Sequence, residues 1–263
     1  MVNASEILEQ VREKKPVVHH LTNWVTIYDC ANIVKVFGAS PVMSHAMEEV
    51  AEMAGIASAL VLNIGTLTSD FVSAMKLAAI AANRKKIPVV LDVCGAGATE
   101  FRDDMCFEIL DQVKVGIIKG NASEIARIAG EKVQTKGVDA ARVDRNLREV
   151  AKGLAGKRSC TVVITGKEDI VADKNRVVLV KNGHPMMAAI VGTGCMAASV
   201  IGTFAAVEED WVAASVAGLV CYEIAAEIAA QEARGPGSFK EKLYDAVFNL
   251  DARTVNRMQR IEE

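Results

Sequence analysis

The chain has 263 residues, of which 51% are hydrophobic and 24% charged, and a formal net charge of −3 at pH 7. This is the balance of a globular protein, and it gives no sign of a surface for nucleic acid or for an anionic membrane. Six scattered cysteines without a C-x-x-C pair, and only four histidines, argue against a zinc site and a disulfide framework. We expect neither a leader nor a membrane span, because no apolar run reaches the roughly 20 residues that cross a bilayer. The prediction is one cytoplasmic domain over residues 1–263.

The chain opens on an amphipathic helical pattern, in which Asn3 and Glu6 have the spacing of a capping box. After it, short β-branched runs alternate with longer helical patterns. The strand-like runs are 16–22, 59–65, 87–93, 115–120 and 160–166, and the helical stretches are 25–37, 46–55, 70–84, 103–113, 122–129 and 139–155. Continuous apolar strands separated by helices indicate a largely parallel sheet that is covered on both faces.

Two further strand-like runs, 169–173 and 176–182, are too close for a helical crossover. We therefore expect an antiparallel hairpin at the edge of the sheet. The rest of the chain is helical in pattern, over 195–207, 210–232, 238–249 and 251–262. The predicted fold class is α/β, with a mostly parallel central sheet and a small antiparallel edge.

Polar and glycine residues follow the predicted parallel strands. They include Asn23, Asn63, Asp92, Lys119 and Thr165. In an open parallel sheet, ligands bind outside the carboxyl ends of the strands. The sequence therefore predicts a binding site at this edge.

The tetrapeptide GTGC, residues 192–195, precedes an apolar helix. The amides of Gly192 and Gly194 can approach a ligand closely, and a helix start attracts negative groups. Cys195 lies at the same helix start, where its thiol pKa is expected to be lowered. The alternative is an ordinary glycine turn followed by a cysteine that fills space.

Two acidic residues follow neighbouring strands. Asp92 ends an apolar strand, and Glu124 lies in the first turn of the helix after KGNAS. Together they could hold Mg²⁺ with water and phosphate oxygens, and Lys119 could bind the same phosphates. The alternatives are a turn carboxylate for Asp92, a residue that stabilises the helix start for Glu124, and a solvated lysine for Lys119.

Met43 and Asn23 are two further candidates for contact with a small ligand, and two common nucleotide-binding motifs are absent. Met43 lies in a loop after a proline, and Asn23 can hydrogen-bond on two sides; their alternatives are core packing and a helix N-cap. The loop after Asp92 lacks the third glycine of G-x-G-x-x-G, because residue 100 is Glu. The chain also contains no P-loop sequence, so any nucleotide is bound in another way.

Five ordered stretches together resemble the hydroxyethylthiazole kinases, thiamine-salvage members of the ribokinase-like superfamily. In chain order, they are VVHHLTNWVTIYDCANIVKVFGASPVMSHAMEEV, LVLNIGTLT, LDVCGAGAT, IKGNASEI and NGHPMMAAIVGTGCMAAS. The resemblance implies a ribokinase-like three-layer αβα sandwich. It also implies ATP-dependent phosphorylation of the hydroxyl of 4-methyl-5-(2-hydroxyethyl)thiazole to its monophosphate, with Mg²⁺.

The resemblance also implies roles for individual residues. The catalytic residue would be Cys195, the thiazole contacts Met43, Gly192 and Asn23, the ATP contacts Lys119 and Thr165, and the acidic positions around Mg²⁺ and phosphate Asp92 and Glu124. Gly194 is expected to present its amide to ATP. The family forms homotrimers with active sites at the subunit interfaces, so the HLTN and PVM stretches are expected to lie near a neighbouring subunit.

The chain departs from the family pattern at two places, and three alternative functions remain open. Lys119 replaces the family's usual arginine, which removes bidentate contact with phosphate. Val93 and Cys94 replace Pro-Val, which changes the rigidity of the loop. The alternatives are a kinase of another small alcohol, such as hydroxymethylpyrimidine or a sugar, a non-catalytic sensor of a nucleotide or thiamine precursor, and, more distantly, a nicotinamide-dependent dehydrogenase.

Overall fold

The computed structural model describes residues 2–131 and 146–263, and the strands of this part form one nine-stranded sheet in the order β2-β1-β3-β4-β5-β6-β7-β8-β9. The strands are β1 (Val17–Leu21), β2 (Ser40–Val42), β3 (Ala59–Asn63), β4 (Val89–Asp92), β5 (Ile117–Asn121), β6 (Thr161–Thr165), β7 (Asp169–Ala172), β8 (Val177–Val180) and β9 (Ile261–Glu262). The pairs from β2 to β6 are parallel, and those from β6 to β9 are antiparallel. This confirms the predicted mostly parallel sheet with an antiparallel edge.

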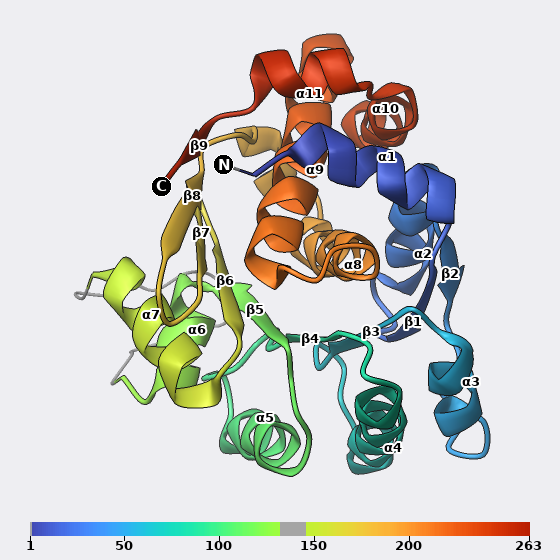
Figure 1. Cartoon of the computed structure of the whole chain (residues 1–263), viewed down its shortest axis with the longest axis vertical. Coiled ribbons are helices and arrows are strands. Elements are labelled where there is room, and N and C mark those ends of the chain that lie inside the picture. The colour runs from blue at the N-terminus through green and yellow to red at the C-terminus, as the bar shows by residue number, and fades with distance from the viewer. Residues whose placement is uncertain (1, 132–145) are drawn as a thin grey trace.

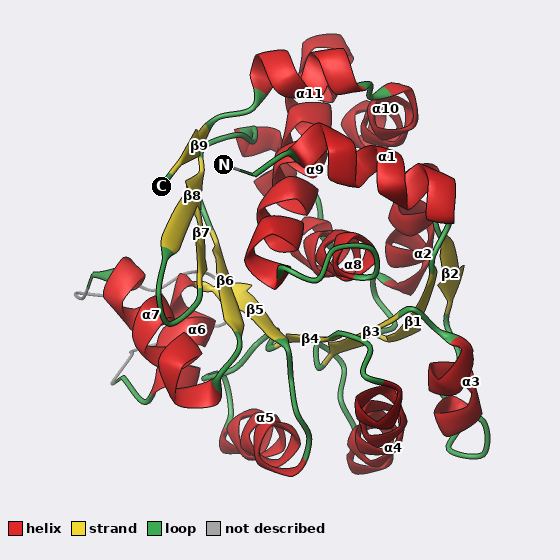
Figure 2. Ribbon diagram, in the orientation of Figure 1, coloured by secondary structure: helices red, strands yellow, loops and turns green. Residues whose placement is uncertain are grey.

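Helices cover both faces of the sheet, so that the molecule has three layers (Figures 1 and 2). One face carries α1 (Ala4–Lys14), α2 (Ile27–Val36), α8 (Thr193–Ala205), α9 (Trp211–Glu232), α10 (Pro236–Asn249) and α11 (Ala252–Met258). The other carries α3 (Val50–Ile56), α4 (Ser69–Lys85), α5 (Glu100–Gln112), α6 (Ala122–Ala129) and α7 (Leu147–Arg158). A short 3-10 helix, Pro185–Ala189, precedes α8.

The strands separate two hydrophobic cores, because successive side chains point to opposite faces. Val61 and Val90 pack with α1, α8 and α9, whereas Leu62 and Leu91 pack with α4 and α5 on the other face. A strand buried on both faces needs apolar residues at every position, which explains the continuous apolar runs in the sequence.

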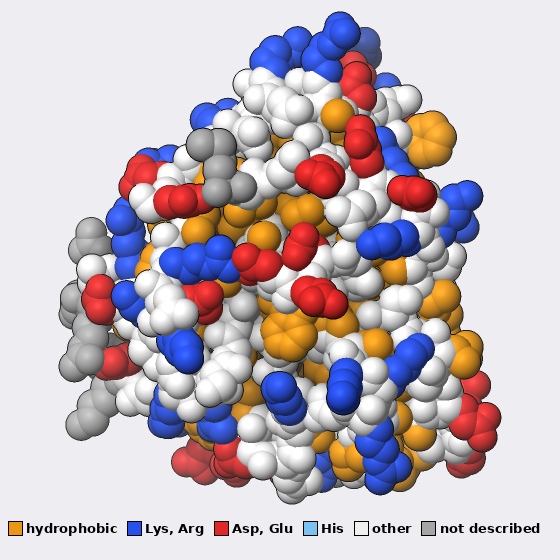
Figure 3. Space-filling model, in the orientation of Figure 1, with side chains coloured by type: hydrophobic (Ala, Val, Ile, Leu, Met, Phe, Trp, Pro, Cys, Tyr) orange, Lys and Arg blue, Asp and Glu red, His pale blue; other side chains and the backbone are white. Residues whose placement is uncertain are grey.

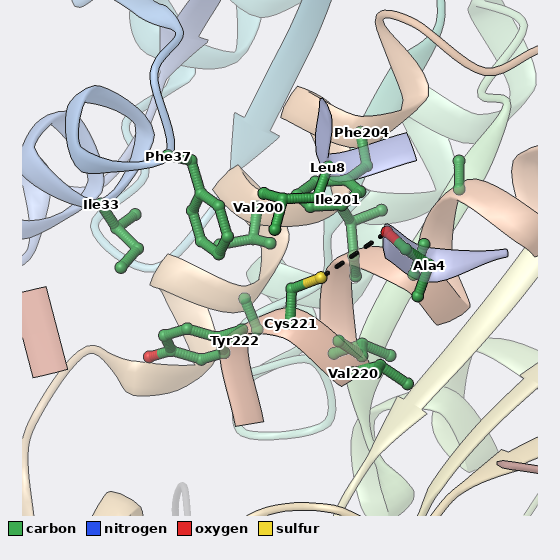
Figure 4. Close-up of a cluster of buried hydrophobic side chains, with 14 of the residues drawn as sticks. Ala4, Leu8, Ile33, Phe37, Val200, Ile201, Phe204, Val220, Cys221 and Tyr222 are labelled. Atoms are coloured by element: carbon green, nitrogen blue, oxygen red, sulfur yellow. Dashed lines mark hydrogen bonds between the residues drawn. The ribbon is translucent and has the colours of Figure 1, made fainter. Parts of the chain in front are cut away.

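Helix α9 lies in the interior of the helical layer. Within residues 2–131 and 146–263 it is the one helix long and apolar enough to cross a membrane, yet 83% of its most apolar window is buried in the molecule. Figure 4 shows its Cys221 and Tyr222 among side chains of α1, α2 and α8, and the Cys221 thiol lies 3.9 Å from the Ala4 carbonyl oxygen. Its apolar composition is therefore that of a core helix.

Several element boundaries differ from the sequence predictions. The three-residue strand β2 was expected to be loop, but it pairs in parallel with β1 at the edge of the sheet. The predicted helix 251–262 is wrong at its end, because the chain leaves α11 and pairs as β9 with the free edge of β8. Ion pairs of Glu262 with Lys181 and Arg148 favour this pairing.

At two helix starts, the structure bears out the sequence prediction only in part. Residues 139–145 of the predicted helix 139–155 lie outside the described residues, and from residue 147 the chain is helical as α7. At the start of α1, the Asn3 side chain accepts the Glu6 amide at 3.3 Å, but Glu6 Oε2 accepts the Asn3 side-chain amide and not its backbone N–H. Half of the predicted capping box is therefore formed.

Charged residues are mixed on the visible surface. On the face shown in Figure 3, acidic and basic side chains both occur, with apolar side chains between them. A mixed surface of this kind carries no strong field of one sign.

Candidate active site

The carboxyl ends of the parallel strands form one polar edge. The register places Asn63 beside Asp92 and Asp92 beside Lys119, and it places Asn121 beside Thr165. Most of these side chains are buried: Asn63 and Asp92 are 1% exposed and Lys119 is 4% exposed. The strand order thus brings together polar residues that are far apart in the sequence.

The GTGC turn faces this edge at the start of α8. Gly192 is the N-cap of the helix and has φ +98°, and a Cβ at this position would lie 2.6 Å from Thr26 Cγ2. A Cβ at Gly194 would lie 3.2 Å from Lys119 Nζ. The turn therefore needs glycine for its conformation and for its closeness to neighbouring side chains. The first amides of a helix have no acceptor within the helix, so they can receive an anion.

Two hydrogen bonds hold this turn in place. The Tyr222 hydroxyl donates to the Thr193 carbonyl oxygen at 3.3 Å, and the Thr193 hydroxyl donates to the Met187 carbonyl oxygen at 2.9 Å. Both hydrogen bonds are partly buried, so they hold the start of α8 in place before any ligand binds.

Cys195 is half-buried in the first turn of α8, and Asn23 Nδ2 donates to its sulfur at 3.2 Å. A hydrogen bond from the Cys94 thiol lowers the pKa of Cys195 most strongly, and burial opposes it. The charge of Lys119 and the hydrogen bond from Asn23 lower this pKa further, to about 5. These interactions favour the thiolate form of Cys195, and the raised pKa of Cys94 favours its thiol form.

Asp92 and Lys119 form a buried ion pair, with Oδ2 and Nζ 3.3 Å apart. Burial raises the pKa of Asp92, and the charge of Lys119 opposes this rise. Burial lowers the pKa of Lys119, but the carboxylates of Asp92 and Glu124 raise it by more, so its ammonium group stays charged. Asp92 Oδ1 is buried without a hydrogen-bond partner among the described residues.

Glu124 connects the loop after β4 with the start of α6. Its Oε1 accepts the Gly95 amide and its Oε2 accepts the Asn121 amide, both at 2.7 Å. The Asn121 side chain accepts the Glu124 amide at 3.0 Å, which completes a capping box. Glu124 therefore stabilises the start of α6, which was the alternative to a metal-binding role. A cation could reach this carboxylate only through its remaining lone pairs or through water.

The other predicted site residues lie along the same row of strand ends. Asn23 follows β1 and is 2% exposed, and its Oδ1 accepts the Thr26 amide at 3.1 Å just before α2, so it also serves the helix start. Met43 follows β2, the outermost strand, and is half-buried. Thr165 ends β6, and its hydroxyl donates to the Gly120 carbonyl oxygen at 3.5 Å. Met43 and Thr165 thus mark the two ends of the row.

No site role was predicted from the sequence for three further residues. The Thr26 hydroxyl donates to Asn23 Oδ1 beside Cys195, the Cys94 thiol lowers the pKa of Cys195, and Arg102 of α5 donates to three backbone carbonyl oxygens of the loops after β3 and β4, at 2.8–3.2 Å. One signal for Arg102 was available, because a cation in the first turn of a helix is unfavourable for the helix dipole. It therefore indicates an acceptor elsewhere. Thr26 and Cys94 carry no comparable signal.

Exposed apolar side chains lie in the segment that follows β1, next to Asn23 in the chain. Trp24 is 50% exposed, and its ring lies 4.7 Å from that of His45 and 5.8 Å from that of Phe71. Val25 and Tyr28 are 67% and 74% exposed. Such a group of exposed apolar side chains is typical of a contact surface.

Comparison with known proteins connects this geometry with one family. A model of the hydroxyethylthiazole kinase family matches residues 8–253. The hydroxyethylthiazole kinase of Methanosarcina mazei is 58% identical over 256 residues, which are 97% of this chain and 98% of that protein.

Solved structures show the same relationship. A hydroxyethylthiazole kinase from Pyrococcus horikoshii OT3 matches with a TM-score of 0.91 and 39% identity, over 98% of each chain. A ribokinase-like superfamily protein from Enterococcus faecalis V583 matches with a TM-score of 0.63 and 13% identity, over 92% of this chain and 93% of that one. At such low identity the second match concerns the fold alone, and it confirms the ribokinase-like architecture.

Proposed function

This chain belongs to the hydroxyethylthiazole kinase family, and from that premise we propose that it phosphorylates the hydroxyl of 4-methyl-5-(2-hydroxyethyl)thiazole with ATP, in thiamine salvage. The observation that carries the proposal is the position of Cys195. Its sulfur lies in the first turn of α8, directly after the Gly192 turn and beside the Asn23 amide. A phosphate-binding helix start and an acceptor for a hydroxyl proton thus share one place.

The start of α8 binds the transferred phosphoryl group in this proposal. Phosphoryl transfer needs mainly positioning and stabilisation of the charge on the phosphate oxygens. The Gly194 amide and the Lys119 ammonium group supply that stabilisation, and Lys119 Nζ lies only 3.2 Å from where a Gly194 Cβ would be. Thr165, at the end of β6, extends the ATP side of the site.

In this proposal, Cys195 binds the hydroxyl group of the acceptor alcohol. The thiazole ring lies toward Met43, Gly192 and Asn23, and its hydroxyl donates a hydrogen bond to the Cys195 thiolate. As the new O–P bond forms and the bond from the γ-phosphorus to ADP breaks, the hydroxyl proton passes to the sulfur. Because the lowered pKa makes this thiolate a weak base, its main contribution is to orient the hydroxyl, and the proton moves late.

Mg²⁺ fits the acidic side of the site. Asp92 Oδ1 is a buried acceptor without a partner among the described residues, which suits a cation or its bound water. No group of three His, Cys, Asp or Glu side chains in residues 2–131 and 146–263 could hold a metal alone, and Mg²⁺ commonly uses one or two carboxylates with water and phosphate. Asp92 would hold the ion, with Glu124 acting through water. When bound, Mg²⁺ would neutralise charge on the phosphate oxygens.

The proposal includes assembly into a homotrimer with the active sites at subunit interfaces. The exposed apolar side chains of Trp24, Val25 and Tyr28 lie within five residues of Asn23 in the chain, and Met43 follows the edge strand β2. A neighbouring subunit would bury these side chains and close the substrate end of the site. Light scattering coupled to size exclusion should give three times the chain mass, and an active monomer would contradict this part.

We also propose that residues 1–263 form one cytoplasmic domain. The sheet is continuous through residues 2–131 and 146–263, and the six cysteines are free thiols. Free thiols persist where the surroundings are reducing. Thermal unfolding in a single transition would support one domain, and two separate transitions would contradict it.

A coupled assay of ADP release tests the activity. We expect Mg²⁺-dependent turnover with the thiazole alcohol, and slower or no turnover with hydroxymethylpyrimidine and simple sugars. Cys195→Ser should lower kcat by less than the roughly 10²–10⁴-fold that loss of a general base causes, because the sulfur mainly orients the hydroxyl. Faster turnover of another alcohol would establish the first alternative, and ATP binding without turnover of any alcohol would establish a sensor.

A further inference from the structure

Asn63 lies between the acidic side of the site, at Asp92, and the side that carries Asn23 and Cys195. It ends β3, between Asn23 after β1 and Asp92 at the end of β4. The side chains of all three residues are at least 98% buried. Because water cannot replace their hydrogen bonds, the contacts among them decide how each side chain points.

The Asn63 amide is oriented by two fixed partners. Its Nδ2 donates to Asp92 Oδ2 at 2.9 Å, and its Oδ1 accepts the Gly65 backbone amide at 2.9 Å. A carboxylate only accepts and a backbone N–H only donates, so the opposite orientation would break both bonds. The acceptor oxygen of Asn63 therefore always faces Asn23.

The orientation of the Asn63 amide fixes the orientation of the Asn23 amide. Its Nδ2 donates to Asn63 Oδ1 at 2.9 Å and to Cys195 Sγ at 3.2 Å, so both of its N–H groups are used. Its Oδ1 accepts the amide and the hydroxyl of Thr26, each at 3.1 Å. If Asn23 were turned around, its oxygen would face both the Asn63 oxygen and the sulfur, and two acceptors would oppose each other.

We infer that Asn63 is a positioning residue, which holds the Asn23 amide so that an N–H donor always points at the Cys195 sulfur. The buried carboxylate of Asp92 orients Asn63, Asn63 orients Asn23, and Asn23 donates to the sulfur. This row links the acidic side of the site to the substrate side through hydrogen bonds alone. The inference rests on the proposed role of Cys195, but it concerns how the sulfur is held.

The test measures the titration of the Cys195 thiol by the rate of its alkylation with iodoacetamide between pH 4 and pH 9, with peptide mass spectrometry to separate Cys195 from Cys94. The titratable groups near this sulfur are Cys94, Lys119, Asp92, Cys30 and Tyr222, and the variants below retain all of them. Asn63→Leu should raise the pKa of Cys195 by about one unit, so that about tenfold fewer molecules carry a thiolate below the wild-type midpoint.

A double-mutant cycle separates this role from a general effect. Asn23→Leu should raise the Cys195 pKa by about one to two units, and the double variant Asn23→Leu/Asn63→Leu should show no further rise, because Asn63 acts only through Asn23. The matched control is Ile64→Ala, which removes buried apolar volume from the adjacent position and should leave the Cys195 pKa unchanged. Asn63→Ala replaces Asn63→Leu if the larger side chain prevents folding.

An unchanged Cys195 pKa in a folded Asn63 variant would overturn the inference, as would additive shifts in the double variant. A shift of the same size in Ile64→Ala would also overturn it. Alkylation requires no substrate, so this result is independent of the kinase assay. A protein that fails to phosphorylate the thiazole would refute the proposed function and leave the role of Asn63 to be decided by the alkylation data.

Discussion

Asp92 and Lys119 form an ion pair whose side chains are only 1% and 5% exposed. Both groups have lost the solvation by water, so each charge depends on the other for its stability. The pair also holds an acceptor oxygen and an ammonium group beside the start of α8. One interaction therefore supports both the fold and the proposed binding of ATP.

Removal of one partner of this pair should be strongly destabilising. We expect Asp92→Asn to lower the free energy of unfolding by about 3–5 kcal/mol, because it removes the carboxylate that pairs directly with the buried Lys119 ammonium group. Urea unfolding followed by circular dichroism measures the loss. The double variant Asp92→Asn/Lys119→Met should recover part of it, and Lys242→Met, which removes an exposed ion pair, serves as a control without measurable loss.

Cys94 should control the acidity of Cys195. We expect Cys94→Val to raise the Cys195 pKa above its value of about 5, because the variant lacks the thiol that donates to the sulfur. Alkylation rates at Cys195 measured against pH give the shift, and the acidic limb of the kcat profile should move to higher pH with it. Cys160→Val, at a buried cysteine outside the site, should change neither. Equal profiles for wild type and Cys94→Val would contradict the prediction.

The Gly192 turn should not tolerate a side chain. Gly192→Ala puts a Cβ at φ +98° and within 2.6 Å of Thr26 Cγ2, so the turn must shift. We expect a loss of about 1–2 kcal/mol from backbone strain and a fall of about 10²-fold or more in kcat/KM from displaced phosphate donors. Gly153→Ala is a suitable control, since a Cβ there meets no atom within 4 Å. Full activity of Gly192→Ala would show that the turn does not bind the phosphate.

Glu223 should make stability depend on pH. Burial, followed by the charge of Asp169 and a hydrogen bond to it, raises the pKa of Glu223 well above its usual value. The folded chain thus keeps a proton that the unfolded chain releases above about pH 4.3. This contribution to stability is fully present below that pH and is lost as the pH rises toward the folded pKa.

Glu223→Gln tests that dependence, because glutamine can donate to Asp169 without titrating. The free energy of unfolding of this variant should exceed that of the wild type at pH 8 and should change less between pH 4 and pH 8. Urea unfolding at several pH values measures both. Glu232→Gln, at an exposed carboxylate of the same helix, should retain the wild-type pH dependence. A variant with the wild-type slope would contradict the assignment.

The order and type of the elements followed closely from local patterns. Helix α6 has the predicted bounds 122–129, and the seven predicted strands are all present. The exceptions are elements that depend on a distant partner: β2 forms only because β1 lies beside it, and β9 only because β8 offers a free edge. Apolar periodicity reports burial along one segment, and it carries no information about a neighbouring strand's unpaired edge.

The fold class, the polar row at the strand ends and the family resemblance of Cys195 and its glycine turn could all be predicted from residue types and their spacing. The contacts within that row could not: Asp92 pairs with Lys119, both oxygens of Glu124 accept backbone amides, and Asn63 separates Asn23 from Asp92. Residue types and spacing set which groups reach the edge of the sheet, whereas strand register and buried hydrogen bonds set which atoms meet there.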